Sequence, residues 1–310
     1  MEFFHKKTNF PFMATRRVWY TLSAVLMVVS FASFFTRGLN FAIDFTGGIS
    51  VEATFRNDAN IEKIRTGVEA AGYHEPQVQT FGSTRDITIR LQSTGETAEV
   101  LRPKFQTIIA GVEPDAQITQ LEVVGPQVGA ELRDSAIQAL AATLFLIGVY
   151  IWFRFHTWRL SLGAILAVMH DPILVLGVFS ITQTPFDLPV VAALLAVIGY
   201  SLNDTVIVFD RIRETFEKNR RQSSDVTLDQ AINQTLSRTI MTKVVTSIVV
   251  VALLLLGGSA LRGFSEALLI GIIAGTYSSI YISSAIALSC GLKAEHLFPT
   301  VRKDPIDELP

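Results

Sequence analysis

The stretch "VIGYSLNDTVIVFD" (residues 197–210) places Asn203 and Asp204 side by side in one of the most apolar regions of the chain. An ionised carboxylate at the centre of a bilayer costs about 3 kcal/mol on insertion scales. A membrane helix that carries one must turn it towards a bundle interior or a water-filled path. We therefore expect Asp204 to act as a reversible proton carrier on an ion pathway, the plain alternative being a structural hydrogen bond to a neighbouring helix.

The composition is that of a membrane protein. Of the 310 residues, 49% are hydrophobic and only 17% are charged, which is too apolar for a soluble enzyme. The net charge of −2 implies no bulk attraction to nucleic acid. The lone Cys290 excludes a disulfide framework and a Cys-based metal site. No phosphate-binding Gly-x-x-x-x-Gly-Lys-Ser/Thr loop occurs, so no cofactor and no enzymatic activity are expected, and energy must come from a partner or a membrane gradient.

Hydropathy predicts an α-helical integral membrane protein with six transmembrane helices. The first candidate follows a segment rich in Lys and Arg and is too long for the apolar region of a signal peptide. We therefore interpret it as an uncleaved signal anchor. The last five candidates form a bundle over residues 133–290. The six candidate spans are residues 18–36, 133–153, 159–181, 187–209, 239–256 and 264–290.

Lys and Arg residues predict the orientation. They crowd the N-terminal tail (1–17), the turn at 154–159, the segment 210–238 and the C-terminal tail (291–310). The short loops at 182–186 and 257–263 are nearly free of them. Both termini should therefore be cytoplasmic, and residues 37–132 should lie on the opposite, outer side of the membrane.

Residues 37–132 form the one sizeable segment outside the spans. Alternating apolar residues predict strands, and apolar residues at helical spacing predict helices. Pro103 falls inside the second expected helix. The resulting βαββαβ order is typical of a ferredoxin-like domain. The expected strands are residues 49–55, 77–81, 86–92 and 117–124, and the expected helices are residues 60–71 and 96–110.

Other polar residues within the spans leave alternatives open. In the fifth span one helical face collects Thr235, Arg238, Thr239, Thr242 and Thr246. Taken alone, Arg238 could reach the headgroups instead. In the third span His170 and Asp171 precede Pro172; they either satisfy the backbone break at the proline or belong to the ion pathway.

Two further patterns complete the spans. A stripe of small residues in the sixth span predicts close helix packing; it comprises Ala267, Gly271, Gly275, Ser279, Ser283, Ala287 and Gly291. After the fourth span, the basic amphipathic segment 211–234 is expected to contact membrane lipid. Its Arg and Lys residues should lie at anionic headgroups while Ile212 and Phe216 face an apolar surface, with a solvated charged helix as the alternative.

Six motifs together resemble the SecF family, the smaller membrane subunits of the bacterial SecD–SecF export complex. They lie in the family's order between about residues 18 and 290. The motifs are "GLNFAIDFTGG" (38–48), "VVGPQVG" (123–129), "HDPI" (170–173), "VIGYSLNDTVIVFDRIRE" (197–214), "QTLSRTIMT" (234–242) and "LIGIIAGTYSSIYISSA" (269–285).

The resemblance implies membership of the resistance-nodulation-division superfamily, with this chain as one six-span half and SecD as the other. It implies that both assist the SecYEG channel and the SecA motor in moving polypeptides, driven by proton or sodium flow. The aspartate of the Gly-Tyr-Ser-x-Asn-Asp motif (Tyr200, Asn203, Asp204) would carry the ion, linked to Arg238. Two other functions stay open: a half-transporter for lipid or small hydrophobic molecules, and a membrane scaffold that conducts nothing.

Overall fold

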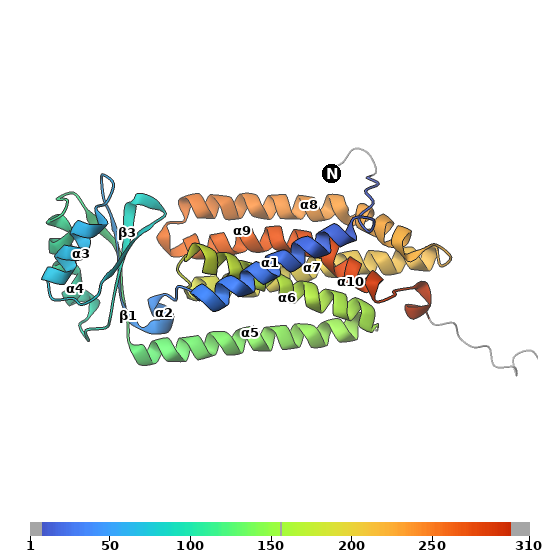
Figure 1. The fold of residues 1–310 in the computed structure, drawn as a ribbon, viewed down its shortest axis with the longest axis horizontal. Helices are drawn as coiled ribbons and strands as arrows, with labels where there is room; N and C mark the ends of the chain where they lie inside the picture. Colours follow the sequence, from blue (N-terminus) through green and yellow to red (C-terminus); the bar gives the residue numbers. More distant parts are fainter. Residues whose placement is uncertain (1–7, 156, 299–310) are drawn as a thin grey trace, which may run out of the picture.

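The computed structural model describes residues 8–155 and 157–298. Within these ranges, six helices have the length and apolar composition to cross a membrane. They lie roughly along one direction, with the strand-containing domain of residues 48–124 at one end (Figure 1). This domain is called the outer domain below for its place beyond the bundle, and the helix ends nearest to it are called the outer ends. Their bounds are α1 (Arg16–Arg37), α5 (Pro126–Phe155), α6 (Trp158–Thr182), α7 (Leu188–Lys218), α8 (Ser224–Leu256) and α9 (Arg262–Tyr277), the last continuing through the π-helical turn η2 (Ser278–Ile282) into α10 (Ser283–Ser289).

Three helices are longer than the spans expected from hydropathy. α5, α7 and α8 have 30, 31 and 33 residues. At about 1.5 Å per residue each exceeds the roughly 30 Å of a bilayer core, because polar turns extend beyond the apolar windows. Segment 210–238 is accordingly the end of α7 and the start of α8, joined by a short turn. Part of the expected tails lies outside the described residues, namely 1–7 and 299–310.

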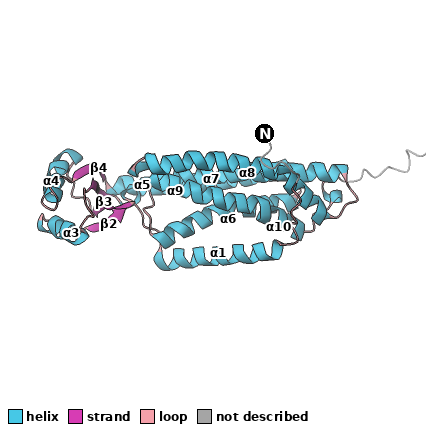
Figure 2. Cartoon of the chain, turned by 90° about the horizontal axis from the view of Figure 1, so that it is seen from above, coloured by secondary structure: helices cyan, strands magenta, loops and turns pink. Residues whose placement is uncertain are grey.

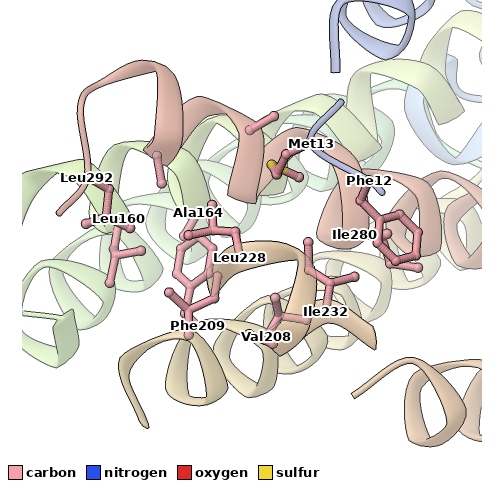
Figure 3. Packing of buried hydrophobic residues seen from close by; sticks show 14 of the residues in the cluster. Phe12, Met13, Leu160, Ala164, Val208, Phe209, Leu228, Ile232, Ile280 and Leu292 are labelled. Atoms are coloured by element: carbon pink, nitrogen blue, oxygen red, sulfur yellow. The ribbon is translucent and has the colours of Figure 1, made fainter. Parts of the chain in front are cut away.

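The apolar face of this helical extension packs inside the protein rather than on headgroups. Ile212 and Phe216 of α7 are buried against Leu228 and Ile232 of α8. Phe12 and Met13 of the N-terminal tail join the same cluster, part of which is shown in Figure 3. Backbone amides of the tail also donate to α8: Met13 N to Asp229 Oδ1 at 2.8 Å and Phe10 N to Asn233 Oδ1 at 2.9 Å. The part of the N-terminal tail after residue 7 is therefore held against α8.

The helices of the bundle differ in how far they are buried. More than half of the apolar window is buried in α6, in α7 and in the helix that begins at Arg262, whereas α1, α5 and α8 are mostly exposed. Glycines permit the close contacts of the inner helices. A Cβ added at Gly271 would lie 2.1 Å from Val197 Cγ2 of α7, and one at Gly163 would lie 2.4 Å from the Ser283 carbonyl oxygen. Small residues thus set the spacing where α9, α7 and α6 meet.

The domain between α1 and α5 is the four-stranded antiparallel sheet of a ferredoxin-like βαββαβ fold, as the sequence predicts. The strand order is β2-β3-β1-β4. β3 begins earlier than expected, at Ser83, because Gly82 alone supplies the tight turn with a φ of 87°. The elements are β1 (Gly48–Thr54), α3 (Ile61–Ala70), β2 (Gln77–Phe81), β3 (Ser83–Leu91), α4 (Ala98–Ala110) and β4 (Gln117–Val124).

The two faces of the sheet differ in chemistry. α3 and α4 cover the face that points away from the bundle, in both views (Figures 1 and 2). Alternate strand residues such as Val51 and Ile89 pack there with Phe105. The other face is polar and carries Glu52 and Arg90 towards the bundle, where cavities of 300, 400 and 480 Å³ separate sheet and helices. The sheet therefore has one hydrophobic core and leaves polar groups at the membrane side.

A short joint connects this domain to α7. Phe41 and Phe186 form a parallel β-bridge, with Ala42 N donating to Phe186 O at 2.9 Å and Phe186 N to Asn40 O at 2.8 Å. In α2 (Ile43–Thr46), Asp44 Oδ2 accepts a hydrogen bond of 2.8 Å from Leu188 N, the first residue of α7. The carboxylate stabilises the amino end of that helix. Motion of α7 along its axis would therefore pull directly on the segment that leads into β1.

Two glycines hold this joint against the rest of the domain. Gly47 has a φ of 70°, and a Cβ there would lie 2.7 Å from Pro126 Cα at the start of α5. Gly48 has a φ of 129°, and its Cβ would lie 2.4 Å from Leu91 O. Side chains are excluded at both positions by conformation and by space. The glycine pair therefore allows α2, β3 and α5 to meet at one point.

Asp187, the residue before α7, has a pKa raised to about 6, mainly because it is buried beside the joint and also because Asp44 is near. Its Oδ1 accepts from Val190 N at 2.9 Å and caps α7. Since the folded protein holds this proton more tightly than the unfolded chain, stability falls as pH rises from about 4 to about 6 and is then level. The free energy at stake is at most about 3 kcal/mol.

Asp187→Asn should remove this slope while keeping a good helix cap. We expect the melting temperature of the variant, relative to the parent, to be higher above about pH 7 than below about pH 5. Thermal unfolding in detergent at several pH values measures it. Asp115→Asn, on the exposed far side of the domain, is the matched control and should not alter the profile. Parallel profiles for parent and Asp187→Asn would contradict the assignment.

Gly271→Ala should destabilise the bundle. The new methyl group would overlap Val197, and overpacking of this kind costs about 1–3 kcal/mol. Gly148→Ala, on α5 with nothing within 4 Å of its Cβ, is the control and should be neutral or slightly stabilising. Melting temperatures in detergent compare the two. Equal melting temperatures would show that the α7–α9 contact tolerates a wider spacing.

Candidate functional site

Asp204 lies in the middle of α7, inside the bundle. It follows Leu188 by 16 residues, which places it about 24 Å from the outer end of the helix. Its side chain is 4% exposed, among apolar residues such as Val208. A carboxylate at this depth needs a counter-charge, a proton or a bound cation.

The counter-charge is Lys243 of α8. Its Nζ lies 2.6 Å from Asp204 Oδ2, and the lysine side chain is 6% exposed. The two opposite charges are therefore in direct contact inside the bundle. On its other side the ammonium lies 3.9 Å from the centre of the Tyr200 ring, close enough for a cation–π interaction.

Tyr200 is itself fixed by α8. Its hydroxyl donates to Thr242 O at 3.1 Å and lies 2.7 Å from Thr246 Oγ1. The ring is thereby held against the lysine stem. Tyr200, Asp204 and Lys243 form one unit that joins α7 to α8 in the middle of the bundle, and this unit is called the charged triad below.

The family resemblance implies a link between Asp204 and Arg238, whereas the residue in direct contact with Asp204 is Lys243. Arg238 and Lys243 are five residues apart, which places them about 140° apart around α8. Lys243 is buried with Thr235 and Thr239, whereas Arg238 and Thr242 are exposed. Arg238 still acts on Asp204 electrostatically, at longer range. Lys243 was missed because it lies at the edge of the threonine face, although its depth, about 20 Å from the outer end of α8, matches that of Asp204.

Several polar positions of the spans are exposed on the surface of the bundle. Asn203 of α7 and Arg238 and Thr242 of α8 are exposed, and nothing lies within 4 Å of a Cβ at Gly199. Polar side chains at this depth do not face lipid without cost. The strip formed by Gly199, Asn203, Arg238 and Thr242 is called the open polar strip below.

His170 and Asp171 lie on α6, where it packs against α7 near Ser201. Asp171 is fully buried. Its Oδ2 accepts hydrogen bonds from Ser201 Oγ of α7 and, at 2.8 Å, from Ser278 Oγ of η2. His170 Nδ1 lies 3.0 Å from its Oδ1. The carboxylate thus connects three helices, which is more than is needed to satisfy the backbone break at Pro172.

The predicted packing residues lie at buried positions, except Gly291 at the end of the stripe, which is exposed. A Cβ at Gly275 would be 3.2 Å from Ser201 Oγ. Ser279 Oγ donates to Thr276 O, and Ser283 Oγ donates to Ser279 O, so both hydroxyls are satisfied within their own helix. Gly271 contacts Val197 as described above. The small-residue stripe therefore faces α6 and α7 in this chain.

These features define a class: a six-helix membrane protein with charged groups buried in its centre and a ferredoxin-like domain between its first two spans. Residues 104–293 match the family "Protein export membrane protein SecD/SecF, C-terminal", and residues 32–59 match the "SecD/SecF GG Motif". The chain belongs to the SecD/SecF family and corresponds to its SecF subunit, a translocase subunit for protein export and not an enzyme.

Relatives support this over nearly the full length. The chain is 45% identical to "Protein translocase subunit SecF" of Haemophilus influenzae, over 98% of this chain and 94% of that protein. It is 44% identical to the subunit of the same name in Pseudomonas aeruginosa, over 96% and 97%. The crystal structure of SecDF, a translocon-associated membrane protein from Thermus thermophilus, superposes with a TM-score of 0.82 at 36% identity, over 91% of this chain.

The chain spans 39% of the SecDF chain that it matches. SecDF carries both parts in one polypeptide, which implies that this chain associates with SecD. These comparisons confirm three predictions: the resemblance to the SecF family, the fold class, and a role as a translocase subunit rather than an enzyme.

Lys243→Met should destabilise the bundle because it leaves Asp204 buried without its cation, a loss that reaches about 3–5 kcal/mol for buried pairs. Asp204→Asn should also destabilise, since it strands the ammonium. The double variant should recover most of the melting temperature, because a neutral pair carries no desolvation penalty for charge. Thermal unfolding of the four proteins in detergent gives the cycle. Additive losses would show that the two groups do not interact.

Proposed function

We propose that this chain, together with SecD, uses a proton or sodium gradient across the bacterial inner membrane to promote export of polypeptides. The charged triad is the observation that carries the proposal. Asp204 is the ion-carrying carboxylate, and Lys243 is its internal competitor. A cation that binds Asp204 releases the lysine, and loss of the cation restores the ion pair. One carboxylate thus has two exclusive occupants, which is what a two-state carrier needs.

The energy available is sufficient for such a switch. One elementary charge moved through the full membrane potential releases about 2.3 kcal/mol per 100 mV. That biases a two-state equilibrium about fiftyfold. Lysine suits the competing role because its ammonium is a compact charge on a flexible stem, whereas arginine favours fixed, planar contacts.

The open polar strip supports the pairing with SecD. Asn203, Arg238 and Thr242 are exposed at the depth of Asp204 and need a polar neighbour there. The SecD half, covering this strip, would line an ion path between the two halves, and Arg238 would act on that path from its rim. Arg238, Asn203 and Tyr200 are thus assigned to ion translocation with Asp204.

The joint at the outer end of α7 supports a mechanical role. α7 carries Asp204 near its middle, and its first residue, Leu188, donates the hydrogen bond to Asp44 of the outer domain's joint. Rearrangement at Asp204 would therefore reach the outer domain through α7. In this proposal the domain is periplasmic, both termini are cytoplasmic, and the SecYEG channel and the SecA motor deliver the client polypeptide. The distribution of basic residues supports that orientation.

Asp204→Asn should abolish gradient-dependent export while the protein still assembles, because the amide carries no charge and takes up no cation. Export into inverted membrane vesicles, with the proton and sodium gradients collapsed separately, measures this and identifies the ion. Arg238→Lys should retain part of the activity, and Arg238→Met little of it. Asp115→Asn, on the exposed far side of the outer domain, is the control and should leave export unchanged.

Full gradient-driven export by Asp204→Asn, in vesicles that contain the variant at the parent level, would contradict ion coupling and leave a scaffold role. Lipid or small-molecule export that depends on Asp204, without an effect on polypeptides, would favour the half-transporter instead.

A further inference from the structure

The charged triad leaves a second buried carboxylate unexplained. Among the described residues of the spans, the buried charged side chains are Asp171, Asp204 and Lys243. Two carboxylates therefore share one ammonium. Lys243 is in contact with Asp204 and reaches Asp171 only through its longer-range field. The bundle is short of one positive charge at Asp171 if both carboxylates are ionised.

His170 contacts Asp171 through one ring nitrogen. Its Nδ1 faces Asp171 Oδ1 at 3.0 Å. Its Nε2 is buried, and no hydrogen-bond partner for it lies among the described residues. The ring therefore fixes the orientation of the carboxylate without linking it to a further group.

The surroundings of Asp171 are built from oxygen ligands. Ser201 Oγ and Ser278 Oγ both converge on Oδ2. Ser278 is the first residue of the π-helical turn η2, and such turns occur frequently at functional sites. One turn earlier, a Cβ at Gly275 would lie 3.4 Å from the same Oδ2. The backbone of α9 thus approaches the carboxylate closely and then widens to present a hydroxyl.

We propose that Asp171, Ser201 and Ser278 form a second cation site, which holds a proton or a sodium ion while Lys243 is paired with Asp204. The inference rests on the proposed ion-coupled function. A carboxylate and two hydroxyls are suitable ligands for a hard monovalent cation, and the carboxylate alone accepts a proton. His170 positions the carboxylate through its Oδ1.

The second site couples cation binding at Asp204 to cation release at Asp171. When a cation binds Asp204 and frees Lys243, the ammonium remains buried and its field still reaches Asp171. Its attraction to Asp171 then grows, which favours release of the cation held there. Binding at one carboxylate is thus coupled to release at the other, through a single lysine. Two cations bound at once would place three positive charges next to two negative ones.

The chain offers a matched pair of serines for the test. Ser278 and Ser279 are adjacent and fully buried. Only Ser278 donates to Asp171, whereas Ser279 Oγ donates to the carbonyl of Thr276. Ser278→Ala therefore removes a ligand, and Ser279→Ala removes a hydroxyl of equal size from the same turn. Asp171→Asn keeps the shape and an acceptor for both serines but removes the charge.

The sodium arm uses thermal unfolding of the purified complex with SecD, titrated with NaCl against equal KCl above about pH 8, where protons compete least. We expect sodium to raise the melting temperature by several degrees in the parent. Asp171→Asn should abolish the effect, Ser278→Ala should weaken sodium binding roughly tenfold, and Ser279→Ala should retain it. The effect should weaken in Asp204→Asn, because Lys243 is then no longer paired and acts more strongly on Asp171.

The proton arm uses infrared spectra of the same complex between about pH 5 and pH 9, in which a buried carboxylic acid gives a separate carbonyl band. For a proton site, a band should be absent in Asp171→Asn, shifted in Ser278→Ala and unchanged in Ser279→Ala. The spectrum of Asp204→Asn contains no band from Asp204, so it shows which carboxylic acid band belongs to which residue. The other titratable groups linked to the site are His170, Tyr277 beside the His170 ring, and Lys243 at longer range.

Either result supports the site and identifies its cation. A complex with no sodium-specific stabilisation and no carboxylic acid band assigned to Asp171 would overturn it. The outcome is separable from the proposed function. Export that is insensitive to Asp204→Asn would contradict ion coupling, yet these two measurements would still report whether Asp171 binds a cation.

Discussion

The contact between Asp204 and Lys243 constrains the rest of the molecule, because neither charge is tolerated alone in the centre of an apolar bundle. The pair needs α7 and α8 at the same depth, with the lysine ammonium lying over the Tyr200 ring. It also needs the surrounding helices to exclude lipid and water. α6 and α9 provide this enclosure on one side through small residues such as Gly271, which packs against Val197 one helical turn from Tyr200.

α7 is the element that relates the membrane part to the outer domain. It carries Asp204 near its middle and ends, on the outer side, at backbone and carboxylate hydrogen bonds to the segment 40–44. Gly47 and Gly48 extend the connection to α5 and β3 without side chains between them. A rigid helix with a charged group at one place and a hydrogen-bonded joint at another transmits displacement better than a flexible linker would. The proposed coupling between cation and polypeptide relies on this property.

Small residues have two functions in this bundle. At Gly271 and Gly163 they permit close backbone contact, which is packing alone. At Gly275 and Ser278 the same stripe borders Asp171, so its spacing also sets the surroundings of a buried carboxylate. A substitution along the stripe therefore changes either stability or the electrostatics of the centre, depending on the turn in which it lies. Melting temperature and cation response distinguish these two effects.

The sequence alone determined the six spans, the βαββαβ order and the buried position of Asp204, because hydropathy and residue periodicity act locally along the chain. It also placed His170 and Asp171 among candidate residues. Only the tertiary structure decided that Lys243, rather than Arg238, contacts Asp204, and that Ser201 and Ser278 meet Asp171. Those pairings depend on how α6, α7, α8 and η2 are rotated about their axes. Rotation is set by packing between helices distant in sequence, and five residues along α8 are enough to turn a side chain from the core to the rim.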